Sequence, residues 1–318
     1  MKIALRLPDH LSSTGTEFTD LGAIAEVALA AEAAGFDGVF ASDHPVPGAD
    51  IDRLGEHHTY DPFVALAYVA GVTSRLRLMS AMTILAYRNP FLTAKAVATL
   101  DVLSGGRVIL GVGAGYMRDE FAALGVDFDE RNELLDEALD VIRLAWGGKP
   151  MSYRGRHFHA PGNQALLVPA QKPHPPVWVG GNSRRAIRRA VHKADGWMPF
   201  PLTPSRAAMD STAPMDGHAD LAAGIGYARS YAAEAGCTRP LDVAYMPLPQ
   251  EALVQPDPDR YLADARRLAG IGVSYFVTQL PMTKRSELLT AIAAFGDEVI
   301  PDVTEMPETT TPGSTDGD

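Results

Sequence analysis

A short apolar run meets two glycines and a helix pattern in Pro176-Val177-Trp178-Val179-Gly180-Gly181-Asn182-Ser183-Arg184-Arg185. This order predicts a strand, a tight turn and a helix capped by Ser183. The amides and the positive dipole end of such a helix favour phosphate or carboxylate, and the helix carries Arg184, Arg185, Arg188 and Arg189 near its start. Taken alone, the segment also fits a purely structural turn before a solvated basic helix.

The same alternation of strand and helix recurs along the whole chain. Strand patterns cover residues 2–7, 39–41, 76–83, 108–112, 177–179, 197–198, 241–245 and 273–277. Helix patterns include one ended by Gly35 and others at 62–73, 90–103, 131–146, 183–193, 217–235, 259–269 and 286–295. Eight strands that alternate with helices favour an α/β fold of the TIM (β/α)8 barrel type, with loop insertions, over an open doubly wound sheet.

The long connections between these elements predict where the chemistry lies. Barrel enzymes place their active sites on loops that follow the carboxyl ends of the strands. Insertions are expected near residues 42–60, 113–130, 147–175 and 199–216, and a hairpin at 151–159 is expected to cap one end of the barrel. We expect one domain over residues 1–304 and a disordered tail over 305–318, which is rich in Thr, Pro, Gly and Asp.

Composition narrows the possible partners. The 318 residues are 46% hydrophobic and 21% charged, which is typical of a globular protein. A formal net charge of -11 argues against a nucleic-acid surface, and no segment has the pattern of a membrane span. The single cysteine, Cys237, cannot form an internal disulfide, so a cytoplasmic setting is expected. A small-molecule substrate is the expected partner.

The segment Ser42-Asp43-His44 follows the second predicted strand. It places a carboxylate and an imidazole at the face where barrel enzymes act, and histidine changes protonation near neutral pH. Asp43 and His44 are therefore candidate catalytic residues. The alternative is that Asp43 caps the following turn and His44 is an ordinary loop residue.

The glycine-rich segment Gly111-Val112-Gly113-Ala114-Gly115-Tyr116 follows the fourth predicted strand. It is not a dinucleotide fingerprint, because Met117 stands where the third glycine belongs. Its small residues would let a flat ring lie against the barrel mouth.

Two other chemistries are not favoured by the motifs. Histidines at 57–58, 157 and 159 do not form a His-Glu-x-x-His pattern, so no catalytic metal is expected. No Gly-x-Ser-x-Gly elbow supports a serine hydrolase.

Four segments together carry a family resemblance: residues 35–44 (GFDGVFASDH), 104–116 (SGGRVILGVGAGY), 176–183 (PVWVGGNS) and 194–197 (ADGW). The chain resembles the bacterial luciferase-like monooxygenase superfamily, in its branch of coenzyme F420-dependent oxidoreductases, over nearly its whole length to about Phe295. The resemblance implies a TIM barrel, a homodimer, and a ring system bound at the carboxyl ends of the strands.

The resemblance also implies roles for particular residues. Asp43 and His44 would lie beside the deazaflavin, with His44 bonding to it or moving a proton. A non-prolyl cis peptide at Ser80-Ala81 would form a bulge that supports the ring, which Ala114 and Gly115 would line.

The cofactor phosphate would be held by Gly180, Gly181, Asn182 and Ser183, with Arg184 as its charge partner. This loop follows the fifth predicted strand, whereas the generic phosphate site of such barrels follows strands seven and eight.

One departure concerns the substrate. Some members of this branch carry an acidic residue directly after the glycine-rich element, where this chain has Tyr116. Tyr116 would donate a hydrogen bond to substrate or pack against the ring. The pocket residues expected from their places at strand ends and insertions are Tyr87, Tyr116, Trp197 and Phe200.

The resulting prediction is an F420-dependent oxidoreductase that transfers hydride to or from a small, rather apolar organic molecule. A deazaflavin has carbon at its reactive position and reacts poorly with oxygen, so reduction or dehydrogenation is expected. The alternatives are an FMN-dependent monooxygenase on the same scaffold and a non-catalytic barrel that binds flavin or another anion.

Overall fold

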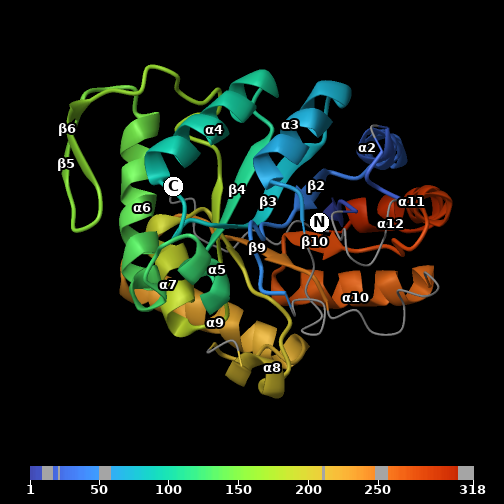
Figure 1. Cartoon of the computed structure of the whole chain (residues 1–318). Coiled ribbons are helices and arrows are strands. Elements are labelled where there is room, and N and C mark those ends of the chain that lie inside the picture. The colour runs from blue at the N-terminus through green and yellow to red at the C-terminus, as the bar shows by residue number, and fades with distance from the viewer. Residues whose placement is uncertain (9–16, 21, 50–58, 210–211, 248–256, 307–318) are drawn as a thin grey trace, which may run out of the picture.

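The computed structural model describes residues 1–8, 17–20, 22–49, 59–209, 212–247 and 257–306. Eight parallel strands close into a barrel in the order β1-β10-β9-β8-β7-β4-β3-β2. Their bounds are β1 (Lys2–Arg6), β2 (Gly38–Ala41), β3 (Arg77–Ile84), β4 (Val108–Gly113), β7 (Val177–Gly180), β8 (Gly196–Met198), β9 (Asp242–Tyr245) and β10 (Tyr275–Thr278). The TIM barrel prediction is confirmed, and the glycine pair does follow the fifth barrel strand (Figure 1).

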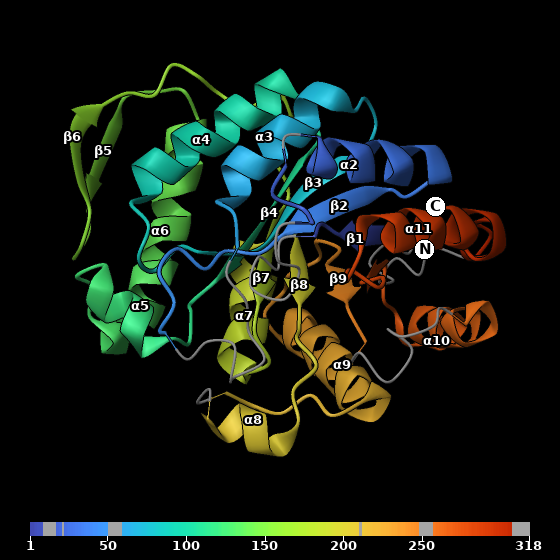
Figure 2. The same cartoon turned by 45° about the vertical axis from the view of Figure 1, so that its right-hand side comes forward.

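Helices surround the strands on the outside, as the two views of Figures 1 and 2 show. The helices that connect the barrel strands are α2 (Ala23–Ala34), α3 (Pro62–Val72), α4 (Pro90–Leu103), α6 (Arg131–Trp146), α7 (Arg184–Lys193), α9 (His218–Glu234), α10 (Pro258–Ile271) and α11 (Arg285–Glu298). Asp61 and Asn89 cap α3 and α4 just before their first-turn prolines. Helix α2 ends as predicted, because Gly35 has a left-handed φ of 94°.

The barrel interior is filled by side chains rather than open. A buried cluster inside the ring of strands includes Phe40, Met79 and Trp178, and the Trp178 indole lies edge-on to Tyr275 at a centroid distance of 4.6 Å. A Cβ at Gly196 would lie 2.2 Å from the Trp178 ring, so only glycine fits beneath this indole. The floor below the carboxyl ends of the strands is therefore solid.

The insertions carry their own short elements. The segment after β4 contains α5 (Arg118–Ala123) and the 3-10 turn η2 (Phe128–Glu130), and the segment after β8 contains α8 (Pro204–Met209). The predicted hairpin is present as β5 (Met151–Arg154) and β6 (His159–Asn163). The expectation that it caps the barrel is wrong: Glu137 of α6 accepts hydrogen bonds from the amides of His157 and Phe158, which holds the hairpin beside α6 (Figures 1 and 2).

The end of the described chain returns to its beginning. Helix α12 (Ile300–Thr304), which the sequence analysis did not anticipate, precedes Glu305 and Met306. The N-terminal amine of Met1 donates to the Met306 carbonyl at 3.1 Å. The tail expected from residue 305 therefore begins with two ordered residues, and 307–318 lie outside the described part of the chain.

Candidate active site at the carboxyl end of the barrel

A cavity of about 390 Å³ opens where the barrel strands end, within the range of roughly 300–1,000 Å³ usual for small-molecule sites. Residues from successive strand ends line it: Arg6, Phe40, Ser42, Asp43, His44, Ala81, Met82, Ile84, Gly113, Ala114, Gly115, Tyr116, Glu120, Arg131, Asn132, Gly180, Gly181, Asn182, Ser183, Ala186, Arg189, Met198, Phe200, Pro201, Leu202, Thr212 and Met246. This is the face on which barrel enzymes build their active sites.

One wall comes from β3, where the strand departs from regular pairing. The register with β4 shifts between Ser80 and Thr83, so the predicted bulge is present. The cis peptide joins Ala81 and Met82, one residue later than the expected Ser80–Ala81 bond. Ser80 still pairs regularly and donates its hydroxyl hydrogen to the Gly111 carbonyl at 2.9 Å, so Ser80 faces β4 and does not line the cavity.

Asp43 is a buried carboxylate held at several points. Arg88 Nε and Nη2 donate to its two oxygens at 2.9 and 2.7 Å, and the Ile84 amide donates to Oδ2 at 3.3 Å. Burial raises the pKa of Asp43, and the Arg88 guanidinium opposes that rise. Asp43 thus ties the end of β2 to the segment after β3, with its hydrogen-bonding capacity taken up by protein groups.

His44 lies beside Asp43 at the same cavity, and its imidazole faces the insertion after β4. His44 Nδ1 is 3.4 Å from Oε1 of Glu120 in α5, and the His44 and Tyr116 rings meet edge-on at 6.2 Å. The His44 amide donates to the Thr59 hydroxyl at 3.0 Å, which fixes the backbone of the loop. The structure therefore brings an imidazole and a buried carboxylate together at the cavity wall.

The opposite end of the cavity is the turn between β7 and α7. Gly181 has a left-handed φ of 111°, and the Ser183 hydroxyl caps α7 by accepting from the Ala186 amide at 3.2 Å. The Asn182 side chain accepts from the Phe200 amide at 2.9 Å and donates to the Phe200 carbonyl at 2.8 Å. Ser183 and Ala186, at the start of α7, line this end of the cavity.

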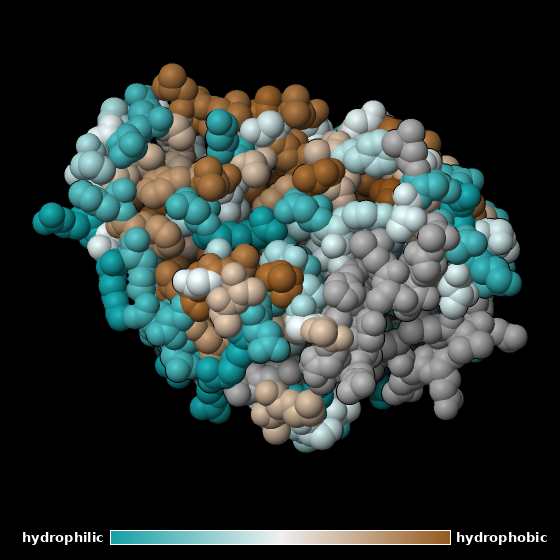
Figure 3. Space-filling view, viewed as in Figure 1, coloured by the Kyte–Doolittle hydropathy of each residue, from teal (hydrophilic) through white to brown (hydrophobic). Residues whose placement is uncertain are grey.

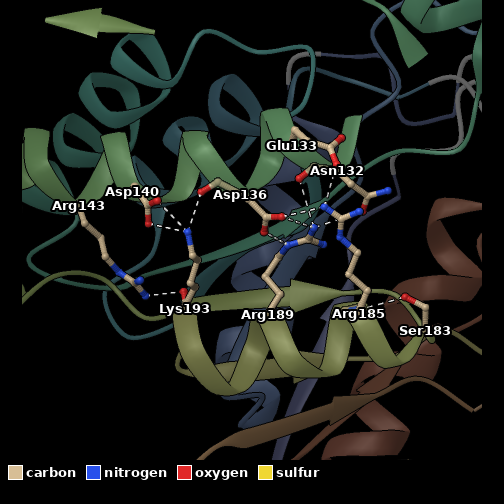
Figure 4. Close-up of polar contacts among 10 residues, drawn as sticks. Asn132, Glu133, Asp136, Asp140, Arg143, Ser183, Arg185, Arg189 and Lys193 are labelled. Carbon is tan, nitrogen blue, oxygen red and sulfur yellow. Dashed lines mark hydrogen bonds and ion pairs between the residues drawn. The ribbon is translucent and has the colours of Figure 1, made fainter. Parts of the chain in front are cut away.

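An ion-pair ladder fixes α7 against α6 (Figure 4). Arg189 and Arg185 both bind Asp136, with Arg189 Nε only 2.6 Å from the carboxylate, and Lys193 binds Asp140 at 2.7 Å. Most of the positive charge on α7 is therefore already paired with carboxylates of α6. Of these arginines, Arg189 also lines the cavity.

Arg184 is placed differently from the prediction. Its guanidinium lies over the Tyr227 ring of α9 at 5.0 Å, and the residue is exposed and absent from the cavity lining. The first residue of α7 points outward because the cavity side of the turn is occupied by Gly181 and Asn182. Arg189, further along α7, lines the cavity instead.

Two predicted pocket residues are also placed elsewhere. Trp197 is fully buried between barrel and α9, with Nε1 donating to the Gly181 carbonyl at 2.8 Å. Side chains alternate along a strand, and Met198 takes the inward position. Tyr87 packs edge-on against Phe121 at 5.2 Å, behind the cavity wall, so it does not line the cavity.

The other predicted residues do line the cavity. They are Asp43, His44, Ala81, Ala114, Gly115, Tyr116, Gly180, Gly181, Asn182, Ser183 and Phe200. The sequence analysis missed Arg6, Met82, Glu120, Arg131 and Arg189 as lining residues. A signal existed for Arg6, since a charge follows the apolar residues Ile3–Leu5 at the carboxyl end of β1, where it bonds to Ser42 and Gln279.

The described residues also bear on two other features, a metal site and a membrane-spanning helix. No group of three or more His, Cys, Asp or Glu side chains in that part of the chain is arranged to hold a metal ion. None of its helices combines the length and apolar character needed to cross a bilayer.

Comparisons with known proteins agree with this architecture. An F420-dependent hydroxymycolic acid dehydrogenase from Mycobacterium tuberculosis (strain ATCC 25618 / H37Rv) is 36% identical over 174 residues, covering 54% of this chain and 47% of that protein. The chain thus spans about half the length of such curated relatives.

Solved structures share the fold over nearly the full chain. An F420-dependent secondary alcohol dehydrogenase in complex with an F420-acetone adduct superposes with a TM-score of 0.71 at 19% identity, covering 95% of this chain and 98% of that one. The monooxygenase RslO1 from Streptomyces bottropensis gives 0.72 at 21% identity, covering 95% and 99%. Residues 1–275 match the family described as luciferase-like monooxygenase, and the chain therefore belongs to the luciferase-like monooxygenase family.

Proposed function

We propose that the protein is an oxidoreductase that binds coenzyme F420 and transfers hydride between its deazaflavin ring and a small organic substrate. The observation that carries this proposal is that one cavity is lined both by His44 and Glu120 and by the turn at Gly180–Ser183. A molecule with a flat ring at one end and a phosphate at the other matches both ends of that cavity.

The residues present fit such a group. Ala81, Ala114 and Gly115 give small, apolar surface on which a planar ring can lie, and Met82 adds a flexible apolar contact. At the other end, the N-terminus of α7 suits a phosphate, and Arg189 adds a guanidinium to the cavity wall, although it also binds Asp136. When bound, the deazaflavin would supply a ring carbon that accepts or donates hydride.

The chain's own residues would position the reactants and handle the proton. His44 is the group at the cavity wall that can accept or donate a proton near neutral pH. Asp43 would act through structure, because Arg88 and the Ile84 amide occupy its carboxylate. Phe200, Met198 and Met246 make the remaining wall largely apolar, which favours a substrate with little charge.

The alternative cofactor is FMN, with an oxygen-using reaction, since the family includes enzymes named as monooxygenases. The relative from Mycobacterium tuberculosis is an F420-dependent dehydrogenase, which favours F420. A further alternative, a barrel that binds flavin without turnover, is disfavoured by an imidazole and a carboxylate at the cavity wall.

Titration of the purified protein with F420 and with FMN tests the proposal. We expect F420 to bind, followed by a change in its absorbance when candidate alcohols or carbonyl compounds are added. Ser183→Ala should weaken binding through the loss of the α7 cap, whereas Ser205→Ala, at an exposed site outside the cavity, should not. Tighter binding of FMN together with oxygen consumption would replace this proposal with the monooxygenase alternative.

We also propose that the protein forms a homodimer in the cytoplasm. Apolar side chains gather along the upper edge of Figure 3, where α3 and α4 lie in Figure 1. Val64 and Tyr68 of α3 and Leu92 and Leu103 of α4 are exposed large hydrophobic residues. A second copy of the chain would remove this surface from water. The lone cysteine suits a reducing compartment.

A further inference from the structure

A buried carboxylate faces the histidine at the cavity wall. Glu120 Oε1 lies 3.4 Å from His44 Nδ1, and only 11% of the His44 side chain and 3% of the Glu120 side chain are exposed. Both residues line the same cavity, although they come from different insertions, one after β2 and one after β4. The glycine-rich segment that ends β4 delivers α5, and hence Glu120, to this position.

The Glu120 carboxylate is not held by hydrogen bonds from the described residues at its buried oxygen, Oε1. A buried carboxylate without a donor costs free energy, so such a group persists where a partner or a function retains it. His44 Nδ1, at 3.4 Å, is within ion-pair distance of this oxygen. The contact has an ion-pair distance rather than hydrogen-bond geometry, as is common for catalytic contacts before a substrate is bound.

Neighbouring residues explain why the pair is held at this separation. Phe121, next to Glu120, packs against Tyr87 and Phe128 at 5.2 Å each, which anchors α5 to the barrel. Tyr116 lies edge-on to His44 at a centroid distance of 6.2 Å. The imidazole therefore contacts both an aromatic ring and a carboxylate.

We infer that Glu120 is a positioning residue that sets the tautomer and orientation of His44. Its carboxylate accepts the proton on Nδ1, which makes Nε2 the basic nitrogen of the ring. The inference deepens the proposed function, since it assumes that His44 handles the proton in hydride transfer. Asp43, the neighbour in sequence, does not perform this task because Arg88 occupies it.

Nitrogen-15 NMR of the cofactor-free protein tests the geometry without any turnover. At a pH where the ring is neutral, we expect His44, assigned by comparison with His44→Asn, to carry its proton on Nδ1. Glu120→Gln should shift the ring toward the other tautomer or a mixture. Asp119→Asn is the matched control, because Asp119 is an exposed acid on the same first turn of α5. Observation of the Nε2–H tautomer in the wild-type protein would overturn the inference even if Glu120→Gln does not fold.

Kinetics with F420 provide the second readout. We expect Glu120→Gln to lower kcat by about ten- to hundredfold with KM and cofactor affinity within about twofold, and Glu120→Asp to recover part of the rate. Asp119→Asn should behave as wild type. An unchanged kcat in Glu120→Gln would contradict the inference. If wild-type protein shows no F420 turnover while His44 keeps its Glu120-dependent tautomer, the proposed function fails and the positioning role stands.

Discussion

Arg88 binds Asp43 at both carboxylate oxygens, with Nε 2.9 Å from Oδ2 and Nη2 2.7 Å from Oδ1. The pair joins the segment after β3 to the segment after β2, and the Asp43 side chain is nearly inaccessible to water. A carboxylate with two guanidinium bonds and a backbone amide bond is poorly suited to proton transfer. In the proposed function, Asp43 therefore supports the site structurally, and His44 is the residue that handles the proton.

Removal of Arg88 should destabilise the fold strongly. Arg88→Ala leaves a buried carboxylate without its cation, and we expect a loss of about 3 to 5 kcal/mol in the free energy of unfolding at pH 7. Burial then raises the pKa of Asp43 with no guanidinium to oppose it. A folded-state pKa above the unfolded value of 3.8 means that the folded protein binds the proton more tightly, so the deficit should shrink as pH falls from 7 toward that value.

Urea unfolding at several pH values measures this effect. The double variant Arg88→Ala/Asp43→Asn is the control, since it has no carboxyl at this site. Its loss in the free energy of unfolding should not change with pH over the same range. Arg118→Ala, which removes an exposed pair with Asp129, should change stability by less than about 1 kcal/mol. A pH-independent deficit in Arg88→Ala would contradict the prediction.

The ladder between α6 and α7 should contribute stability that acid removes. Burial raises the pKa of Asp136, but its bonds to Arg189 and Arg185 lower it further, so the net pKa is below the ordinary value of 3.8. The ion pair of Asp136 with Arg189 therefore contributes its full stability above pH 3.8. That contribution is lost as the pH falls through the lower folded-state pKa of Asp136. Asp136→Asn should lose about 1 to 3 kcal/mol at pH 7 because Arg189 is buried, and less below about pH 4.

Glu133→Gln is the matched control for that ladder. Glu133 lies on the same helix and binds Arg185, but its side chain and that of Arg185 are about half exposed. We expect a loss of about 0 to 1 kcal/mol, measured by the same urea titrations. Equal losses for the two variants would show that burial of Arg189 does not decide the energetics.

Gly111 of β4 and Gly180 of β7 should respond differently to substitution by alanine. A Cβ at Gly111 would lie 2.0 Å from the backbone oxygen of Ser80, which cannot move without breaking the β3–β4 pairing. Gly111→Ala should therefore yield little folded protein. At Gly180 the Cβ would lie 2.7 Å from the terminal methyl of Met82, a flexible group that can turn.

We expect Gly180→Ala to fold but to push Met82 into the cavity. The affinity for F420, measured by fluorescence titration, should fall by about tenfold. This is consistent with overpacking costs of about 1–3 kcal/mol. Circular dichroism identifies whether each variant is folded. Normal cofactor affinity in a folded Gly180→Ala variant would show that Met82 does not limit the space for the ring.

Substitution of the apolar face should disrupt self-association. Leu92 of α4 is 70% exposed, and a charged side chain there cannot be buried against a second copy without cost. We expect Leu92→Glu to be monomeric by light scattering after gel filtration, while the wild-type protein is a dimer. Leu166→Glu, at an exposed leucine in the insertion before β7, should remain dimeric. A monomeric wild-type protein would end the dimer proposal.

Much of the fold was predictable because its signals are local. Helix α4 begins at Pro90 and ends at Leu103, and α6 runs from Arg131 to Trp146, both as their patterns indicated. Prolines after capping residues and apolar stripes depend only on near neighbours in sequence. The short helices α5, α8 and α12 were missed because they carry no long periodic pattern.

The candidate site was predictable only in part. Motif positions placed His44 and the Gly180–Ser183 turn at one cavity, since both follow strand ends of the same barrel. The direction of Trp197 depended on which side of β8 faces inward, and the position of Arg184 depended on the tyrosines of α9. Neither is encoded in spacing along the chain.

The sequence by itself determined the strand-helix alternation, the capped glycine turn and the strand ends on which the site is built, because hydrophobic periodicity, caps and glycines act over a few residues. Only the tertiary structure decided that Arg88 occupies Asp43, that Asp136 pairs with Arg189, and that Glu120 faces His44. These are contacts between residues 45, 53 and 76 positions apart, counted from their numbers. Such pairs form only when barrel closure brings different strand ends together, so no local pattern can specify them.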